Sequence, residues 1–411
     1  MLLYRLLISL FSCAALVQAM GLPDGVRMRL GRLRPQSGPH IWLHGASNGE
    51  LASVRPVIIA LARARPDLKW LITSNSFSGM RMVREWDLPG VSAMLAPLDL
   101  KWVSRRMMRV WNVEAHISLE SEIWPHRFAV CPGPVILLGA RLGQGTARAW
   151  GRLPGLARQI FGRVSFASAQ DTLSLERLGQ LGLSAQARGP VFDLKALYTP
   201  PDLAPDDRLR RAFPRAQTWL AASTHPGEED VVLKAHLELL RQAPQSRLIL
   251  APRHPQRAGE IARLIERHGL SYSRRSMGGA PDAQVYLADS LGEMALWYTL
   301  AGRVFIGGTL CRRGGHTPYE PAAFGCALLH GPDTRNFRAS FERLAQSGAC
   351  ALVTNAGELA QALEECKTAQ AQQQSGKAAT EALRQELALD PFIARIMEYM
   401  VFDSQTGTTK L

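Results

Sequence analysis

Short apolar runs alternate with longer amphipathic stretches from residue 40 onward. The apolar runs are continuous, which is typical of strands buried on both faces of a parallel sheet. The stretches between them repeat apolar residues at helical spacing, for instance at 51–65, 77–86, 228–241 and 261–268. The predicted strands are 41–45, 70–74, 92–96, 116–119, 135–138 and 165–169, then 219–223, 247–251, 285–287, 304–307, 327–329 and 351–353.

A proline-rich segment divides this pattern into two halves. The segment "YTPPDLAPDD", residues 198–207, interrupts both periodicities and is typical of a linker. We therefore expect an α/β protein with two doubly wound domains that face a cleft, where ligands bind at the carboxyl ends of the strands. A closing helix is predicted at 381–389. The expected divisions are a membrane anchor with a basic flank at 1–34, a first domain at 35–200, a second domain at 201–390 and a tail at 391–411.

The N-terminus has a different pattern. An apolar run at 6–19 is short for a membrane-spanning helix and close to the length of a signal-peptide core. Only Arg5 precedes the run, whereas four arginines follow it, and the positive-inside rule then keeps the downstream chain in the cytoplasm. We favour an uncleaved anchor or interfacial helix at the inner membrane over a cleaved signal peptide. The arginines expected to hold anionic lipid headgroups there are Arg27, Arg29, Arg32 and Arg34.

Composition narrows the class of protein without choosing a partner. The 411 residues are 46% hydrophobic and 20% charged, which is typical of a packed soluble protein. The net charge of +13 comes mainly from arginine, which suits the phosphate or carboxylate groups of nucleotides, anionic lipids or nucleic acids. The six cysteines form no C-x-x-C pair, so we expect small core residues in a reducing compartment.

An acid follows the first predicted strand, in "IWLHGASNGE" at residues 41–50. Glu50 should lie at the carboxyl edge of the sheet, where a carboxylate can act as a general base towards an incoming hydroxyl group. The same position is the first turn of the next helix, where the helix dipole favours any acid. The residues alone leave both interpretations open.

Two further acids follow the fourth predicted strand, in "LESEIWP" at residues 119–125. Glu120 and Glu122 are two positions apart, so they share a face if the chain is extended. They would instead cap a helix if one begins near Ile123. This stretch is therefore a second candidate site at the end of an apolar strand.

The second half carries two strand ends with anion-binding character. In "AASTHPGEED", residues 221–230, Ser223 and Thr224 offer hydroxyl and N–H groups to an anion at a helix N-terminus, or simply cap that helix. In "APRHPQR", residues 251–257, Arg253 could pair with a phosphate through two nitrogens. If Arg253 is simply an exposed surface residue, it gives no information about function.

The densest stretch is "FIGGTLCRRGGHTPYEPAAFG", residues 305–325. Its two glycine pairs allow a close backbone approach to a ligand, and the carboxylate of Glu320 suits the hydroxyl groups of a ribose. The stretch is neither a G-x-G-x-x-G fingerprint nor a Walker A loop. The chain contains no D-x-D, the usual metal–diphosphate clamp, so we expect a metal-independent reaction.

Taken in order, these segments resemble the 3-deoxy-D-manno-octulosonic acid (Kdo) transferases of lipopolysaccharide synthesis. "HGASNGE" is similar to the family's H-x-x-S-x-G-E, "ESEIWP" to its E-T-E-L-W-P, and "ARLGQGT" (140–146) to its A-R-L-S segment. "STHPGEE", "PRHPQR" and "GGHTPYEPAAFG" follow in the family's order. The resemblance covers most of residues 38–365 and the N-terminal anchor.

The resemblance implies a GT-B fold with two Rossmann-like domains, and an inverting transfer of Kdo from CMP-Kdo to a lipid A precursor (lipid IVA) without a metal or cofactor. It implies CMP-Kdo, the precursor and anionic inner-membrane lipids as partners, and no nucleic acid. Glu50 would be the catalytic base, with Glu122 as the second essential acid. The residues expected at the acceptor are Ser47, Asn48, Gly49 and Arg141. Those expected at the donor are Ser223, Thr224, His225, Arg253, His254, Gly307, Gly308, Gly314, Gly315, His316 and Glu320.

Some positions depart from the family's pattern. Asn48 stands where a small apolar residue is common, and Gly143 where serine is expected. "RGPVFDLKA", residues 188–196, is only loosely similar to the family's G-N-x-K-F-D, so its lysine is lost or displaced to Lys195. Two alternatives stay open: a relative that uses another nucleotide sugar or acceptor, including a UDP-sugar epimerase, and a catalytically silent, membrane-tethered lipid-binding module.

Overall fold

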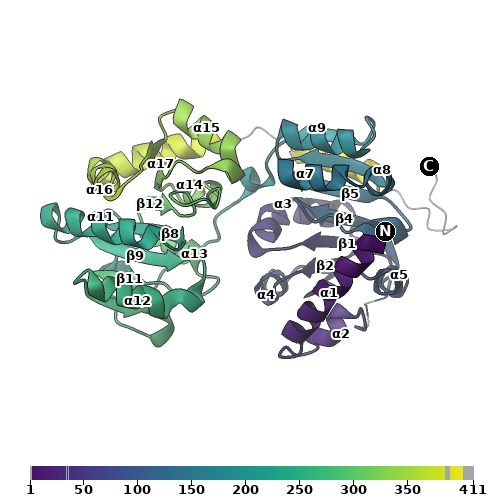
Figure 1. Cartoon of the computed structure of the whole chain (residues 1–411), viewed down its shortest axis with the longest axis horizontal. Helices are drawn as coiled ribbons and strands as arrows, with labels where there is room; N and C mark the ends of the chain where they lie inside the picture. Colours follow the sequence, from purple (N-terminus) through teal and green to yellow (C-terminus); the bar gives the residue numbers. More distant parts are fainter. Residues whose placement is uncertain (1, 34, 36, 385–388, 401–411) are drawn as a thin grey trace. The chain divides into compact units, whose positions relative to one another are not determined.

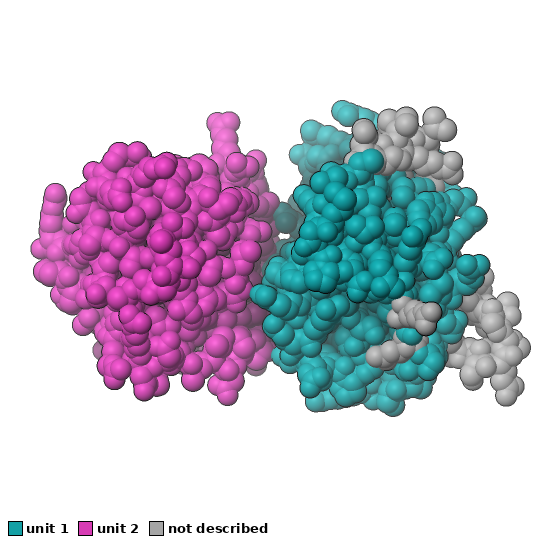
Figure 2. Space-filling view, turned by 90° about the horizontal axis from the view of Figure 1, so that it is seen from below, with its two compact units in different colours: residues 1–197, 385–411 teal, residues 198–384 magenta. Residues whose placement is uncertain are grey.

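The computed structural model describes residues 2–33, 35, 37–384 and 389–400. The chain divides into a first unit of residues 1–197 and 385–411 and a second unit of residues 198–384 (Figure 2). Each unit contains one parallel seven-stranded sheet covered by helices (Figure 1). This arrangement confirms the α/β class that the continuous apolar strands predict.

The sheet of the first unit reverses its strand order next to β1. Its order is β3-β2-β1-β4-β5-β6-β7, and neighbouring strands are parallel. The chain runs outward from β1 to β3 and then returns to the other side of β1 at β4. Doubly wound sheets bind ligands at such a switch point. The strands are β1 (His40–Gly45), β2 (Lys69–Ser74), β3 (Val91–Leu95), β4 (Val113–Leu119), β5 (Val135–Ala140), β6 (Val164–Ala169) and β7 (Arg188–Val191).

Successive residues of β1 pack on opposite faces of this sheet. Ile41 and Leu43 belong to one apolar cluster and Trp42 to the other, as the alternation of side chains along a strand requires. The helices that cover the two faces begin and end as follows: α1 (Leu2–Ala19), α2 (Gly25–Arg29), α3 (Asn48–Ala64), α4 (Phe77–Glu85), α5 (Lys101–Val110), α6 (Pro125–Val130), α7 (Gln144–Gly151), α8 (Pro154–Phe161), α9 (Thr172–Leu181), the 3-10 helix η1 (Leu194–Leu197) and α18 (Leu389–Glu398).

The second unit repeats the same construction. Its strand order is β10-β11-β9-β8-β12-β13-β14, so the switch point lies between β8 and β12. The strands are β8 (Thr218–Thr224), β9 (Arg247–Pro252), β10 (Tyr272–Arg274), β11 (Val285–Leu287), β12 (Arg303–Ile306), β13 (Ala327–His330) and β14 (Cys350–Leu352). The helices are α10 (Asp207–Ala212), α11 (Glu228–Gln242), η2 (Pro255–Arg257), α12 (Ala258–Arg267), η3 (Arg275–Met277), α13 (Met294–Leu300), α14 (Tyr319–Ala323), η4 (Arg335–Phe337), α15 (Arg338–Gln346), α16 (Ala356–Glu365) and α17 (Ala369–Leu383).

The edge strands β7 and β10 were not predicted from the sequence. Their sequences "RGPV" and "YSR" lack the continuous apolar run that marks the inner strands. A strand at the edge of a sheet has one neighbour only, and its backbone can tolerate glycine and proline. The other two edge strands, β3 and β14, do contain apolar residues and were predicted, so the two strands missed are those without an apolar run.

The C-terminal helix belongs to the first unit. α18 packs Phe392 and Ile396 into the apolar cluster that contains Phe166. The expected division instead gave the second domain a closing helix at 381–389 and left 391–411 as a tail. The chain returns to the first unit because the apolar face of α18 is buried there.

The N-terminal segment forms α1, followed by α2. Among the residues that the structure describes, no helix is both long and apolar enough to cross a membrane. Arg34, one of the arginines predicted to hold lipid headgroups, lies outside the described residues.

Replacing Gly376 by alanine should destabilise the second unit, because a Cβ atom there would lie 2.2 Å from the carbonyl oxygen of Gly325. We expect the free energy of unfolding to fall by roughly 1–3 kcal/mol. In the matched control, Gly259→Ala in α12, the new Cβ meets nothing within 4 Å. That change should stabilise the helix by up to about 1 kcal/mol. Calorimetry on the full chain measures both, and equal melting temperatures for the two variants would contradict the close packing of α17.

Candidate active site

Three acids meet where the first sheet reverses its strand order. Glu50 follows β1 in the first turn of α3, and Glu120 and Glu122 follow β4, the neighbour of β1. The carboxyl ends of adjacent parallel strands lie at one edge of the sheet, so the reversal brings these side chains together. The negative charges of Glu120 and Glu122 both act on Glu50. We call these three residues the acid cluster.

The turn that begins α3 holds the carboxylate of Glu50. Ser47 is the N-cap of the helix; its Oγ accepts a hydrogen bond from the N–H of Glu50 at 3.4 Å and donates to Oε1 at 3.0 Å. The N–H of Ala46 donates to Oε2 at 2.7 Å. These bonds form a reciprocal helix cap. Glu50 therefore lies in the first turn of α3 and takes part in its cap, which is one of the two interpretations of the sequence. This position does not prevent Glu50 from also taking part in a reaction.

The pKa of Glu50 is raised to about 7. Burial is the largest cause and the charge of Glu120 the second, while the N–H of Ala46 and the hydroxyl of Ser47 offset part of the effect. A carboxyl group with this pKa can take up a proton near neutral pH and release it again. This is the property that a general base needs.

Glu122 has the opposite environment. Its Oε2 accepts hydrogen bonds from Nε2 of His44 and Nε1 of Trp124, both at 2.9 Å, and from Nδ2 of Asn75 at 3.2 Å. Burial alone would raise the pKa of Glu122, but the hydrogen bond and charge of His44, the bond from Trp124 and the charge of Arg127 bring it below its ordinary value. Glu122 therefore stays ionised at a pH where Glu50 is half protonated.

His44 connects Glu122 to the neighbouring strand. Burial, and then the charge of Arg127, lower the pKa of His44 to about 4, so its ring is neutral at pH 7. With Nε2 donating to Glu122, Nδ1 can accept from Oγ1 of Thr73 at 3.0 Å. His44 opens the motif "HGASNGE", yet its role was missed because Glu122 lies 78 positions further along the chain.

A buried cation lies next to these groups. Arg127 is 1% exposed, and its Cζ lies 5.1 Å from the ring centroid of Trp42 and 4.7 Å from that of Trp124. Its backbone N–H donates to Oδ1 of Asp99 at 2.8 Å, and its Nη2 donates to the carbonyl oxygen of Pro97 at 2.6 Å. Two aromatic faces, the carbonyl oxygen of Pro97 and the carboxylate of Asp99, 3.9 Å from Nε, thus stabilise a positive charge that water does not reach.

Glu120 pairs with Lys195. Glu120 has φ +46°, which is uncommon for a residue other than glycine, and its Oε1 accepts from Nζ of Lys195. Burial alone would lower the pKa of Lys195, but the charges of Glu120 and Asp193 raise it above its ordinary value. Glu50 also contributes to this shift. Lys195, the residue to which the family's lysine would be displaced, thus pairs with a member of the acid cluster.

Asn48, which departs from the family's pattern, is already paired. Its Oδ1 accepts hydrogen bonds from Oγ of Ser76 at 3.3 Å and from Oγ of Ser78 at 3.0 Å. These bonds join the start of α3 to the start of α4. The residues expected at the acceptor lie on the turns that follow β1 and β5, at the same edge as the acid cluster: Ser47, Asn48, Gly49 and Arg141.

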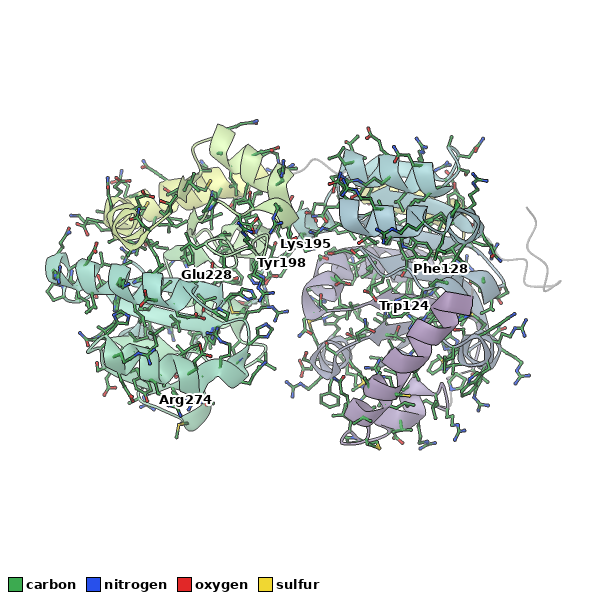
Figure 3. The ribbon with its side chains drawn as sticks, in the orientation of Figure 1. Trp124, Phe128, Lys195, Tyr198, Glu228 and Arg274 are labelled. Carbon is green, nitrogen blue, oxygen red and sulfur yellow. The ribbon has the colours of Figure 1, made fainter. Side chains whose placement is uncertain are left out.

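In the second unit a buried carboxylate organises the glycine loop after β12. Glu228, which is labelled in Figure 3, is 1% exposed and accepts four backbone N–H groups. Burial raises the pKa of Glu228, and these bonds offset part of the shift. The N–H groups belong to His225 (2.9 Å), Gly308 (2.7 Å), Thr309 (3.0 Å) and Leu310 (2.9 Å). The amide of Gly308 is thus engaged by the protein itself.

The loop packs closely against the end of β8. A Cβ atom at Gly307 would lie 2.4 Å from the carbonyl oxygen of Ser223, and Gly308 has φ +73°, so both positions require glycine. The N–H of Gly315 donates to the carbonyl oxygen of Gly308 at 2.8 Å. The two glycine pairs therefore form one compact loop beside the strand that ends in Thr224.

Three histidines face one another at this loop. Nε2 of His225 lies 2.9 Å from Nε2 of His316, and their parallel rings are 5.2 Å apart. The ring of His254 meets that of His225 edge-on at 5.7 Å. Burial, and then neighbouring positive charges that include Arg253, lower the pKa of His225 and His316 to about 4. The surroundings are cationic and suit an anion such as a phosphate.

Glu320 lies in the first turn of α14, near two tyrosines. Burial, and then the charge of Glu320, raise the pKa of Tyr198 and Tyr298. The other residues expected at the donor end or follow the adjacent strands β8, β9 and β12, at the switch point of the second sheet: Ser223, Thr224, His225, Arg253, His254, Gly307, Gly308, Gly314, Gly315 and His316.

Two doubly wound sheets, with acids at one switch point and cations at the other, define a two-domain α/β protein of the GT-B type. Solved structures share this fold. A putative UDP-N-acetylglucosamine 2-epimerase from Listeria monocytogenes has a TM-score of 0.62 at 11% identity and covers 89% of this chain and 97% of its own. The UDP-GlcNAc 2-epimerase from Neisseria meningitidis has a TM-score of 0.59 at 11% identity and covers 88% of this chain and 100% of its own. At such identities the likeness concerns the fold alone.

Sequence relatives identify the family. The chain is 31% identical over 338 residues to the 3-deoxy-D-manno-octulosonic acid transferase of Haemophilus influenzae, covering 79% of this chain and 78% of that protein. It is 30% identical over 316 residues to the enzyme of the same name from Bordetella pertussis, covering 74% and 73%. A family model described as "3-Deoxy-D-manno-octulosonic-acid transferase (kdotransferase)" matches residues 24–196. The chain belongs to the Kdo transferase family and is a glycosyltransferase, which confirms the resemblance.

Replacing Glu50 by glutamine should stabilise the first unit at alkaline pH. A pKa raised from 4.5 to about 7 means that folding opposes ionisation of Glu50. The resulting cost is absent below the ordinary pKa, grows as the pH rises to about 7 and is complete above that value. Glutamine carries no charge, and its amide oxygen can still accept the N–H of Ala46, while its amide nitrogen would donate to Oγ of Ser47 where the carboxylate accepts from it. We expect the variant to be more stable by on the order of 1–3 kcal/mol at about pH 8.

Thermal unfolding at two pH values measures this effect. The stabilisation by Glu50→Gln should disappear as the pH falls below the ordinary pKa of 4.5, because the wild-type carboxyl group is then mostly protonated in both the folded and the unfolded state. A variant that is no more stable than the wild type at alkaline pH would contradict the raised pKa.

Proposed function

We propose that this chain transfers Kdo from CMP-Kdo to a lipid A precursor, with inversion at the anomeric carbon and without a metal ion. One observation carries the proposal: Glu50 is a partly buried carboxylate with a pKa of about 7 at the switch point of its sheet. Membership of the Kdo transferase family supports the sugar. The histidine and arginine groups of the second unit support an anionic donor.

In the proposed reaction, the oxygen of an acceptor hydroxyl group forms a bond to the anomeric carbon of Kdo. The bond from that carbon to the phosphate oxygen breaks, and its electron pair leaves with CMP. The hydroxyl proton moves to the carboxylate of Glu50. Attack and departure on opposite faces of the sugar give inversion.

The remaining members of the acid cluster have supporting roles in this proposal. Glu122 stays ionised and is fixed through Oε2, so it can orient the acceptor by a hydrogen bond. Glu120 pairs with Lys195 and raises the basicity of Glu50 by its charge. Removal of a proton from the acceptor is then favoured without a fully exposed base.

In the second unit we assign the phosphate of CMP to the histidine site. Negative charge on the phosphate grows as the bond to the sugar breaks, and His225, His316 and Arg253 can stabilise it. Glu320 can accept hydrogen bonds from the hydroxyl groups of the ribose.

The proposed location is the cytoplasmic face of the inner membrane. α1 has 18 residues, and its sequence "LLYRLLISLFSCAALVQA" is mostly apolar. A helix of this kind can lie in the interface between headgroups and acyl chains. Such a position would bring the enzyme to a lipid acceptor.

Release of CMP from CMP-Kdo in the presence of a lipid A precursor tests the proposal. Glu50→Gln should lower turnover at least about a hundredfold, which is the scale of a general base. The matched control is Glu358→Gln. Glu358 lies in the first turn of α16 and accepts the N–H of Thr354 at 2.7 Å, just as Glu50 accepts that of Ala46.

The control separates catalysis from helix capping. Glu358→Gln should turn over like the wild type, because it removes the charge from an equivalent cap on the second unit. Full activity of Glu50→Gln would falsify the role of Glu50. If the wild type turns over with another acceptor but with none of the lipid A precursors, the proposed donor stands and the proposed acceptor is wrong.

A further inference from the structure

A basic groove lies on the first unit, outside the acid cluster. Figure 1 shows α5, which forms one side of it, at the outer edge of that unit. The groove encloses about 700 Å³ and is lined by Arg32, Lys101, Trp102, Arg105, Arg106 and Arg109. All of these side chains except the tryptophan are cations, and no acid is among them.

The sequence of α5 explains why the cations gather there. Val103 and Met107 are buried on the inner side of the helix. Lys101, Arg105 and Arg109 are spaced four residues apart on the outer side, and all three are exposed. Like charges at this spacing repel one another along a helix. Within the described part of the chain these three cations form no ion pair with an acid, so an anionic ligand would relieve the repulsion.

Trp102 gives the groove an apolar edge. Its side chain is 52% exposed, although a ring of this size is usually buried. Tryptophan beside cations is typical of protein surfaces that meet the headgroups of a bilayer. Duplex nucleic acid, by contrast, is held mainly by cations through its phosphates. The exposed ring therefore favours a membrane surface.

The basic flank predicted from the sequence is largely engaged elsewhere. Nη1 and Nη2 of Arg29 donate to the carbonyl oxygens of Ala96 at 2.8 Å and of Asn75 at 2.9 Å. Arg27 pairs with Asp24 at 2.8 Å. Arg29 thus ties α2 to the ends of two strands of the sheet. The exposed cationic surface is formed by α5 instead.

The groove is also continuous with the N-terminal helices. Nε of Arg106 donates to the carbonyl oxygen of Gly31 at 3.0 Å, just after α2. The next residue, Arg32, lines the groove. A bilayer that binds α1 would therefore also contact the groove, because the groove is bonded to the segment that follows α2.

We infer that α5 and Arg32 form a docking surface for the anionic phospholipid headgroups of a bilayer. The cations hold the headgroup phosphates, and Trp102 enters the interface beside them. The choice of a membrane rests on the proposed function, because the acceptor of that reaction is a lipid. The charge pattern and the groove are present whether or not the proposed function is correct.

Flotation of the full chain with phosphatidylcholine vesicles, with and without phosphatidylglycerol, tests this inference. The double variant Arg105→Gln/Arg109→Gln should bind the anionic vesicles roughly tenfold or more weakly than the wild type. Trp102→Ala should weaken the same binding. The matched control is Arg208→Gln/Arg211→Gln, which removes two cations from a groove of about 500 Å³ in the second unit.

The control should bind like the wild type. Equal binding by the α5 double variant and the control would overturn the inference. Two further results would also overturn it. One is binding to duplex DNA that is as tight as binding to anionic vesicles and is lost in the α5 variant. The other is release from vesicles by inorganic phosphate at constant ionic strength, which would indicate a site for a soluble phosphate.

Transfer to a detergent-dispersed acceptor separates this inference from the proposed function. The α5 double variant should keep the wild-type rate there, since its substitutions lie outside the acid cluster, and a loss of rate would assign α5 to the reaction itself. An unchanged melting temperature would show that the substitutions leave the fold intact. If the wild type transfers no Kdo, the vesicle result still decides the docking surface.

Discussion

Three carboxylates at one buried sheet edge repel one another, and the chemistry of the first unit follows from how that repulsion is relieved. The reversal of strand order between β1 and β4 brings Glu50, Glu120 and Glu122 together, and burial strengthens the effect of each charge on the others. Glu120 receives the cation of Lys195, and Glu122 receives three hydrogen-bond donors. Glu50 receives only one backbone N–H and one hydroxyl group, so it is the acid that holds a proton near neutral pH.

The second unit uses the same topology with the opposite charge. Its switch point between β8 and β12 gathers histidines and arginines, while the buried acid at the start of α11, Glu228, is satisfied by four backbone N–H groups. Because its hydrogen bonds go to backbone N–H groups, this carboxylate fixes the loop after β12 and does not neutralise the cationic side chains. Those side chains can then act on a ligand. One architecture therefore places a carboxyl group of raised pKa at one switch point and cationic side chains at the other.

Local pattern predicted much of this arrangement. Apolar runs identified the inner strands, and the position of Glu50 after the first strand placed it at a ligand-binding edge. The pattern could not predict what depends on contacts far apart in the chain. The pairing of His44 with Glu122 spans 78 positions and that of Lys195 with Glu120 spans 75, and neither leaves a periodic trace. The edge strands β7 and β10 and the return of α18 were missed for the same reason, because they depend on partners supplied by the rest of the fold.

Infrared difference spectroscopy of the intact chain tests the central claim most directly, by following the protonation of Glu50 itself. Subtracting the spectrum of Glu50→Gln from that of the wild type isolates one carboxyl group among the 35 acidic side chains. The acid cluster predicts that the carboxyl band of Glu50 disappears with a midpoint near pH 7. A midpoint at or below the ordinary value of 4.5 would show that Glu50 is a plain helix cap and would contradict the account.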